Sequence, residues 1–166
     1  MQHHHTLSPL VAAPATTARD ADRGHPGWTW LVFRFLGALA VLGVGAVHLE
    51  AFTGPYSSIP TIGTLFVLNF VAATVIGLIL LAPLEHVAGA RAGAAVALVT
   101  GAGMALAGVS YVMLYVSERR PLFGFQEPGY DPAAISASRW LELAAFALLG
   151  ISLLLRFATR SPARRW

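Results

Sequence analysis

Residues 61–82, TIGTLFVLNFVAATVIGLILLA, form an uninterrupted apolar stretch without a charged side chain. A hydrocarbon core about 30 Å thick needs roughly 20 apolar residues of helix, so this stretch is long enough to cross a bilayer. Three further stretches of this kind lie at about 29–50, 92–116 and 134–157. Each is predicted to be helical, because lipid offers backbone groups no other partner. The predicted fold class is all-α, an integral membrane four-helix bundle with up-down-up-down topology.

The composition of the chain also indicates a membrane location. Its 166 residues are 56% hydrophobic and 11% charged, with a mean hydropathy of +0.65, which is too apolar for a water-soluble domain. Cysteine is absent, which excludes disulfides, thiol redox chemistry and cysteine metal ligands. The lipid bilayer is the expected partner. No nucleic-acid partner is predicted, because the arginines behind the pI near 10 lie beside the spans, where membrane orientation explains them.

The distribution of arginine predicts the orientation. Arginines occur in the N-terminal tail (1–27), in the loop at Arg91 and in the basic C-terminal tail (159–166), whereas the loop at 51–60 has none. The loop at 117–132 is the exception, since it contains Arg119 and Arg120, but it also contains three acidic residues. The positive-inside rule therefore predicts that both tails are cytoplasmic and flank a bundle at 28–158. The N-terminal tail is expected to be disordered. All basic residues are arginine and Ala and Gly are abundant, which indicates a GC-rich bacterial source and the bacterial cytoplasmic (inner) membrane.

Small residues recur at helical spacing and predict which faces of the spans pack together. Such a stripe lets another helix approach closely, and each stripe here also carries a polar residue. The stripes are Gly37, Val41, Val44, Gly45 and His48 in the first span, Asn69, Ala73 and Gly77 in the second, Gly93, Ala97, Thr100, Gly103, Ala107 and Gly108 in the third, and Ser138, Glu142, Ala145 and Leu149 in the fourth.

Antiparallel threading brings four polar side chains to one depth near the outer end of the bundle, namely His48, Asn69, Tyr111 and Glu142. An ionisable side chain at the centre of a span costs about 2.5–3.5 kcal/mol. Residues that incur such a cost usually face inward and mark functional sites. These four residues are therefore the predicted cofactor-binding site, with Glu142 as its most informative member.

Several interpretations of this cluster stay open. Glu142 could pair with His48, could remain protonated in the apolar interior, or could ligate a metal together with the imidazole, a ligand set that suits zinc, iron or manganese. Alternatively, Arg139 offers Glu142 an i,i+3 ion pair. His48 and Asn69 could act only as hydrogen-bonding glue between helices, and Tyr111 could be an interface anchor.

A haem needs two axial ligands, which four-helix membrane bundles often supply as histidines. Only His48 and His86 lie within or beside the spans. They are expected on opposite sides of the membrane and so cannot hold one iron. Met113 lies at about the depth of His48 and is the remaining axial candidate, although apolar helices also use methionine as filler.

Part of the sequence resembles known membrane proteins. The run His48-Leu49, Tyr56, Ile59-Pro60, Ile62-Gly63, Leu65-Phe66 and Leu68-Asn69 resembles small, uncharacterised four-span membrane proteins of GC-rich bacteria. The first span is also loosely similar to the DoxX-like four-helix membrane proteins. The similarity lies in Arg34, Gly37 and the small-residue stripe that ends at His48-Leu49. The resemblance implies the fold and no particular reaction.

Two functions remain open from the sequence. Outside the polar cluster the spans carry few polar groups, and no phosphate-cradling loop is present. We therefore predict an accessory or structural subunit that docks on a larger membrane complex, or on a second copy, through its small-residue faces or the aromatic loop at 117–132. The alternative is a membrane redox protein that binds a metal, a quinone or a haem at the cluster of His48 and Glu142. Whether the protein is an enzyme stays open at this stage.

Overall fold

The computed structural model describes residues 28–83 and 91–160. Its elements are α1 (Thr29–Thr53), the short 3-10 helix η1 (Pro55–Ser58), α2 (Pro60–Leu81), α4 (Ala92–Ser117) and α5 (Pro132–Arg160). All four α-helices are long and apolar enough to cross a membrane. The predicted all-α membrane bundle is confirmed. The predicted tail 1–27 lies outside the described residues, as do residues 161–166 of the predicted tail 159–166, whose first two residues belong to α5.

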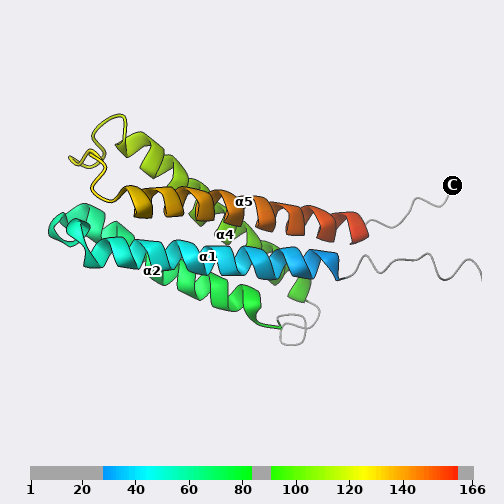
Figure 1. Cartoon of the computed structure of the whole chain (residues 1–166). Coiled ribbons are helices and arrows are strands. Elements are labelled where there is room, and N and C mark those ends of the chain that lie inside the picture. Colours follow the sequence, from blue (N-terminus) through cyan, green and yellow to red (C-terminus); the bar gives the residue numbers. More distant parts are fainter. Residues whose placement is uncertain (1–27, 84–90, 161–166) are drawn as a thin grey trace, which may run out of the picture.

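The helices form an antiparallel bundle (Figure 1). α1 contacts both α2 and α5, while α4 contacts α5 and, less extensively, α2. α1 begins and α5 ends at one end of the bundle, here called the terminal end. The opposite end, here called the distal end, carries η1 and the loop 118–131 between α4 and α5.

The outer surface of the bundle is apolar. Leu39, Leu68, Leu98 and Leu154, one from each helix, are all more than half exposed. Burial of such side chains in lipid is favourable, whereas their exposure to water is not. The protein is therefore an integral membrane protein whose helices contact the bilayer.

Polar side chains instead occupy the interior, as a bilayer requires. At the terminal end Arg34 and Arg156 are almost fully buried, and their guanidinium carbons lie 5.3 and 4.8 Å from the ring centroid of Trp30. Arg34 also donates a hydrogen bond to the Ala82 carbonyl over 3.4 Å, and the Ser152 hydroxyl donates to the Trp30 carbonyl over 2.9 Å. These contacts join α1, α2 and α5.

The predicted small-residue stripes do set the helix spacing. A methyl group at Gly37 would lie 2.5 Å from Leu149 Cδ2, and one at Gly103 would lie 2.8 Å from Leu149 Cδ1. Leu149 is fully buried. The two glycines therefore make room for one leucine of α5 between α1 and α4.

Candidate functional site

His48 lies on the inner face of α1, near the distal end, and is 9% exposed. Its Nδ1 is 2.8 Å from the Val44 carbonyl oxygen. A carbonyl can only accept, so Nδ1 carries a proton and donates it to Val44. Nε2 then faces α5, where it lies 3.9 Å from Glu142 Oε1. The predicted approach of these two side chains is present, at a distance too long for a direct hydrogen bond.

Glu142 is 1% exposed and is held by its own helix. The Ser138 hydroxyl, one turn earlier on α5, donates to Glu142 Oε1 over 3.0 Å. Oε2 is buried and has no hydrogen-bond partner among the described residues. Arg139 forms an ion pair with Glu118 at the end of α4. The carboxyl of Glu142 thus faces the interior with half of its accepting capacity unused.

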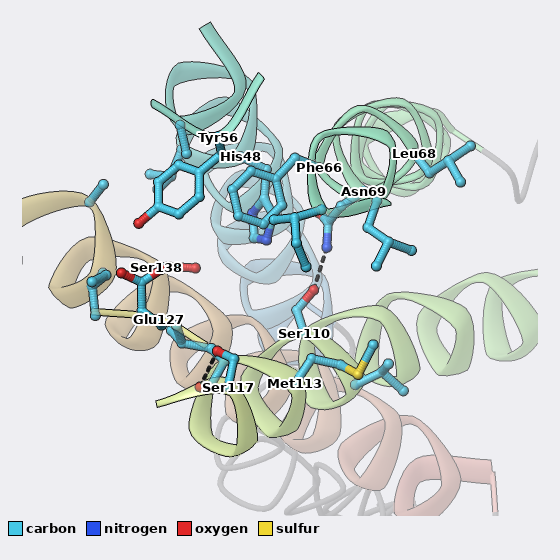
Figure 2. Close-up of a pocket in the computed structure, with 18 of the residues that line it drawn as sticks. His48, Tyr56, Phe66, Leu68, Asn69, Ser110, Met113, Ser117, Glu127 and Ser138 are labelled. Atoms are coloured by element: carbon cyan, nitrogen blue, oxygen red, sulfur yellow. Dashed lines mark hydrogen bonds between the residues drawn. The ribbon is translucent and has the colours of Figure 1, made fainter. Parts of the chain in front are cut away.

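Asn69 of α2 is 9% exposed and points toward α4 (Figure 2). Its Nδ2 donates to the Ser110 hydroxyl oxygen, while Oδ1 is buried without a partner in the described part of the chain. The ring of Phe66, also on α2, meets the His48 imidazole edge-on with the centroids 5.2 Å apart. Nothing in the sequence distinguishes Ser110 from the other small residues of α4.

A cavity of about 350 Å³ opens beside these groups (Figure 2). Apolar side chains of α1, α2, α4 and the start of α5 form most of its wall. We call it the distal pocket, and its lining residues with polar side-chain atoms are His48, Tyr56, Asn69, Ser110, Ser117, Glu127 and Ser138. Glu142 stands behind the wall, in contact with two lining residues, Ser138 and His48. Tyr111 is half-buried and does not belong to the lining.

The loop 118–131 closes the distal pocket at the distal end. The Glu127 backbone N–H donates to the Ser117 carbonyl over 2.9 Å, and the Glu127 carboxylate accepts from the backbone N–H groups of Gly129 and Tyr130 over 2.8 and 3.1 Å. These bonds fold the loop back over the end of α4. Glu127 is consequently 9% exposed although it belongs to a loop.

Tyr56 of η1 fastens this loop from the other side. Its ring is 2% exposed and packs against Phe125 and Tyr130, with centroid distances of 6.1 and 6.0 Å. Burial raises the pKa of the Tyr56 hydroxyl, and its hydrogen bond to Glu127 raises that pKa further. The hydroxyl therefore stays protonated and donates to the carboxylate.

No pattern in the sequence assigns a role to Glu127. A carboxylate in a loop followed by Pro-Gly normally indicates a solvated turn. The burial of Glu127 depends on Tyr56, which lies 71 positions earlier in the chain. No local signal in the sequence reports that contact.

His48 and Glu142, the predicted metal ligands, do lie close together. Within the described ranges 28–83 and 91–160, however, no group of three or more His, Asp or Glu side chains could hold a metal ion. Protein metal sites usually provide at least three ligands. Met113, the possible axial partner of His48, lines the same pocket, whereas His86 lies outside the described residues.

The chain matches no protein-family model, no curated protein and no solved structure. The similarity to DoxX-like and other small four-span bacterial proteins therefore stays a prediction. The fold and the site define a class, which is a four-helix integral membrane protein with a mostly apolar pocket near one end of the bundle.

Proposed function

We propose that this protein binds a small lipid-soluble molecule with a polar head group in the distal pocket. The supporting observation is an apolar cavity of about 350 Å³ with a few convergent polar side chains. Ligand pockets typically measure about 300–1,000 Å³ and combine apolar walls with a small number of polar groups. The cavity is at the lower end of this range, which fits a molecule of one ring and a short tail.

The position of the opening supports access from the bilayer. Leu68 of α2 and Val109 of α4 both line the pocket and are 58% and 61% exposed. The cavity therefore reaches the lipid-facing surface between α2 and α4. On the aqueous side the loop residues Leu122, Phe125 and Glu127 form part of its wall. A ligand dissolved in lipid can reach the pocket without crossing this loop.

A cavity-filling substitution tests this proposal. Ala72 lines the pocket, whereas its neighbour Val71 is half exposed to lipid and is absent from the lining. We expect native mass spectrometry to detect one bound 4-hexylphenol per wild-type chain. We expect Ala72→Phe to lose this adduct because the new ring occupies the cavity, and Val71→Phe to keep it.

Met113→Trp fills the same cavity from α4 and serves as a second variant, in case Ala72→Phe unfolds. Circular dichroism in detergent would show that each variant remains helical. Unchanged binding of 4-hexylphenol by folded Ala72→Phe and Met113→Trp would contradict the proposal.

The redox alternative places a metal, a quinone or a haem in the same distal pocket. A quinone belongs to the proposed ligand class by its solubility in lipid, and of the two predicted ligands only His48 lines the pocket. Metal or haem binding there stays a prediction, for which the support is two ligands 3.9 Å apart. Elemental analysis and the visible spectrum of the purified protein, compared with those of His48→Ala, would test it.

The accessory-subunit role also stays a prediction. Of the aromatic loop residues that the sequence offered to a partner, Phe125 packs inward on Tyr56, while Phe123 is 58% exposed. Isolation of the protein from its native membrane in mild detergent would show whether other subunits accompany it.

A further inference from the structure

We infer that the head group bound in the distal pocket is a hydrogen-bond donor, and that the ligand is a neutral, hydroxyl-bearing amphiphile such as an alkylphenol. This inference rests on the proposed function and adds the chemistry of the ligand. It follows from the polar groups of the pocket wall, which offer more acceptors than donors.

His48 presents an acceptor. Its Nδ1 proton is already donated to the Val44 carbonyl. In the neutral ring, Nε2 therefore carries a lone pair. That nitrogen lies 3.9 Å from Glu142 Oε1, which is too far for a hydrogen bond. Among the described residues Nε2 therefore has no hydrogen-bond donor, and its lone pair can accept from a ligand.

The serines of the wall are acceptors for a related reason. Ser138 donates its one hydroxyl proton to Glu142 Oε1, and Ser117 donates its proton to the Leu114 carbonyl. Each oxygen keeps lone pairs that can accept from a ligand. Neither serine has a second proton to give.

Asn69 provides the most direct indication. Its Oδ1 is buried and lacks a hydrogen-bond partner among the described residues. Asn69 is more than nine-tenths buried and lines the pocket. A buried acceptor without a donor destabilises the folded protein, because it has lost its hydrogen bonds to water. A ligand hydroxyl that reaches Asn69 Oδ1 would remove this cost.

Few donors oppose these acceptors. The Ser110 hydroxyl accepts from Asn69, so its own proton is still available to donate. The Asn69 amide likewise has one further N–H to donate. The Glu127 carboxylate also only accepts, and it is already engaged by Tyr56 and two backbone N–H groups. A ligand with only carbonyl or ether oxygens would therefore leave most of the wall unsatisfied.

The route of access selects a neutral donor. The pocket opens toward lipid between Leu68 and Val109, and a charged group in the bilayer core is costly. An ammonium head group would have to pass through that core. A phenol or alcohol carries its donor without this cost.

A matched ligand pair tests the inference. 4-Hexylphenol and 4-hexylanisole have the same ring and tail, but the methyl ether has no proton to donate. We expect wild-type protein to bind the phenol about tenfold more tightly, because one buried hydrogen bond is worth roughly 1.4 kcal/mol. The measurement is adduct titration by native mass spectrometry from detergent.

The outcomes separate this inference from the proposed function. Equal affinity for the two ligands, with binding lost in Ala72→Phe, would overturn the donor inference and leave the proposed function standing. The absence of binding of either ligand would overturn both.

A variant locates the acceptor. We expect Asn69→Leu to reduce the preference for the phenol at least threefold while affinity for the anisole stays within twofold, because Oδ1 is removed and the apolar wall is kept. The lipid-facing control Val71→Leu should keep the full preference. If Asn69→Leu unfolds, the comparison of 4-hexylphenol with 4-hexylanisole on wild-type protein still tests whether the ligand is a hydrogen-bond donor. An unchanged preference in folded Asn69→Leu would exclude Asn69 as the acceptor and contradict the inference as stated.

Discussion

At the scale of single residues, Glu142 is the most informative position. A carboxyl group that is 99% buried within a membrane-spanning helix is costly unless other groups satisfy it. Here the Ser138 hydroxyl satisfies one oxygen, and His48 faces the same oxygen at 3.9 Å. The pair of Ser138 and Glu142 is a local arrangement, four residues apart on α5.

We predict that Ser138→Ala lowers the stability of the bundle by about 1–3 kcal/mol, because Glu142 Oε1 loses its donor in a buried setting. Ser136→Ala is the matched control, since Ser136 is exposed on the same helix. Denaturation followed by circular dichroism in detergent would measure the difference. Ser138→Thr keeps the hydroxyl and should restore much of the loss.

Equal stability of Ser138→Ala and Ser136→Ala would show that this hydrogen bond contributes nothing to folding. The carboxyl group would then be held by other contacts.

At the scale of the helices, small residues decide how closely the elements approach. α1 meets α5 where Gly37 accommodates Leu149, and α1 meets α2 where a methyl group at Gly77 would lie 2.6 Å from Leu42 Cγ. In lipid the helices gain little from the hydrophobic effect, so close packing carries much of their association.

We predict that Gly37→Ala destabilises the bundle by about 1–3 kcal/mol, a typical cost of overpacking. The added methyl group would lie 2.5 Å from Leu149 Cδ2 and 3.3 Å from the Leu149 backbone nitrogen, so rotation of the leucine alone cannot relieve the clash. Gly101→Ala is the control, because nothing lies within 4 Å of its added methyl group. Unfolding in detergent would be compared for the two variants.

Gly101→Ala should be neutral or slightly stabilising, since alanine favours helix by about 1 kcal/mol. A loss in Gly101→Ala equal to that in Gly37→Ala would mean that glycine itself, and not the space it leaves, matters at these positions.

At the scale of the whole molecule, the two ends of the bundle differ in chemistry. The terminal end holds two buried arginines around Trp30, whereas the distal end holds the buried acids Glu127 and Glu142 and the pocket. The positive-inside rule predicts that the arginine-rich end is cytoplasmic.

The absence of cysteine makes this orientation directly testable. Ser57 in η1 and Thr159 near the end of α5 are both exposed, at opposite ends of the bundle. We predict that a membrane-impermeant maleimide labels Ser57→Cys on intact cells and labels Thr159→Cys only after the cells are opened. The reverse pattern would invert the predicted topology.

Much of the fold could be predicted from the sequence, because the length and the apolar composition of each span can be read from its own residues. The inward stripe containing His48 and the stripe containing Glu142 could likewise be predicted, since helical spacing fixes which residues share a face. Tyr111 shows the limit of this reasoning. Its depth follows from its position in the span, but neighbouring residues differ by about 100° around a helix, and Ser110 lines the pocket instead.

The sequence by itself determined that the chain enters a membrane as four helices and that their polar stripes turn inward, because lipid penalises any other arrangement of such side chains. The tertiary structure alone decided that Asn69 meets Ser110 across two helices and that Glu127 folds under Tyr56 to close a pocket. These contacts join segments 41 and 71 residues apart. They depend on how the helices rotate and on how the loop packs, which no single segment encodes.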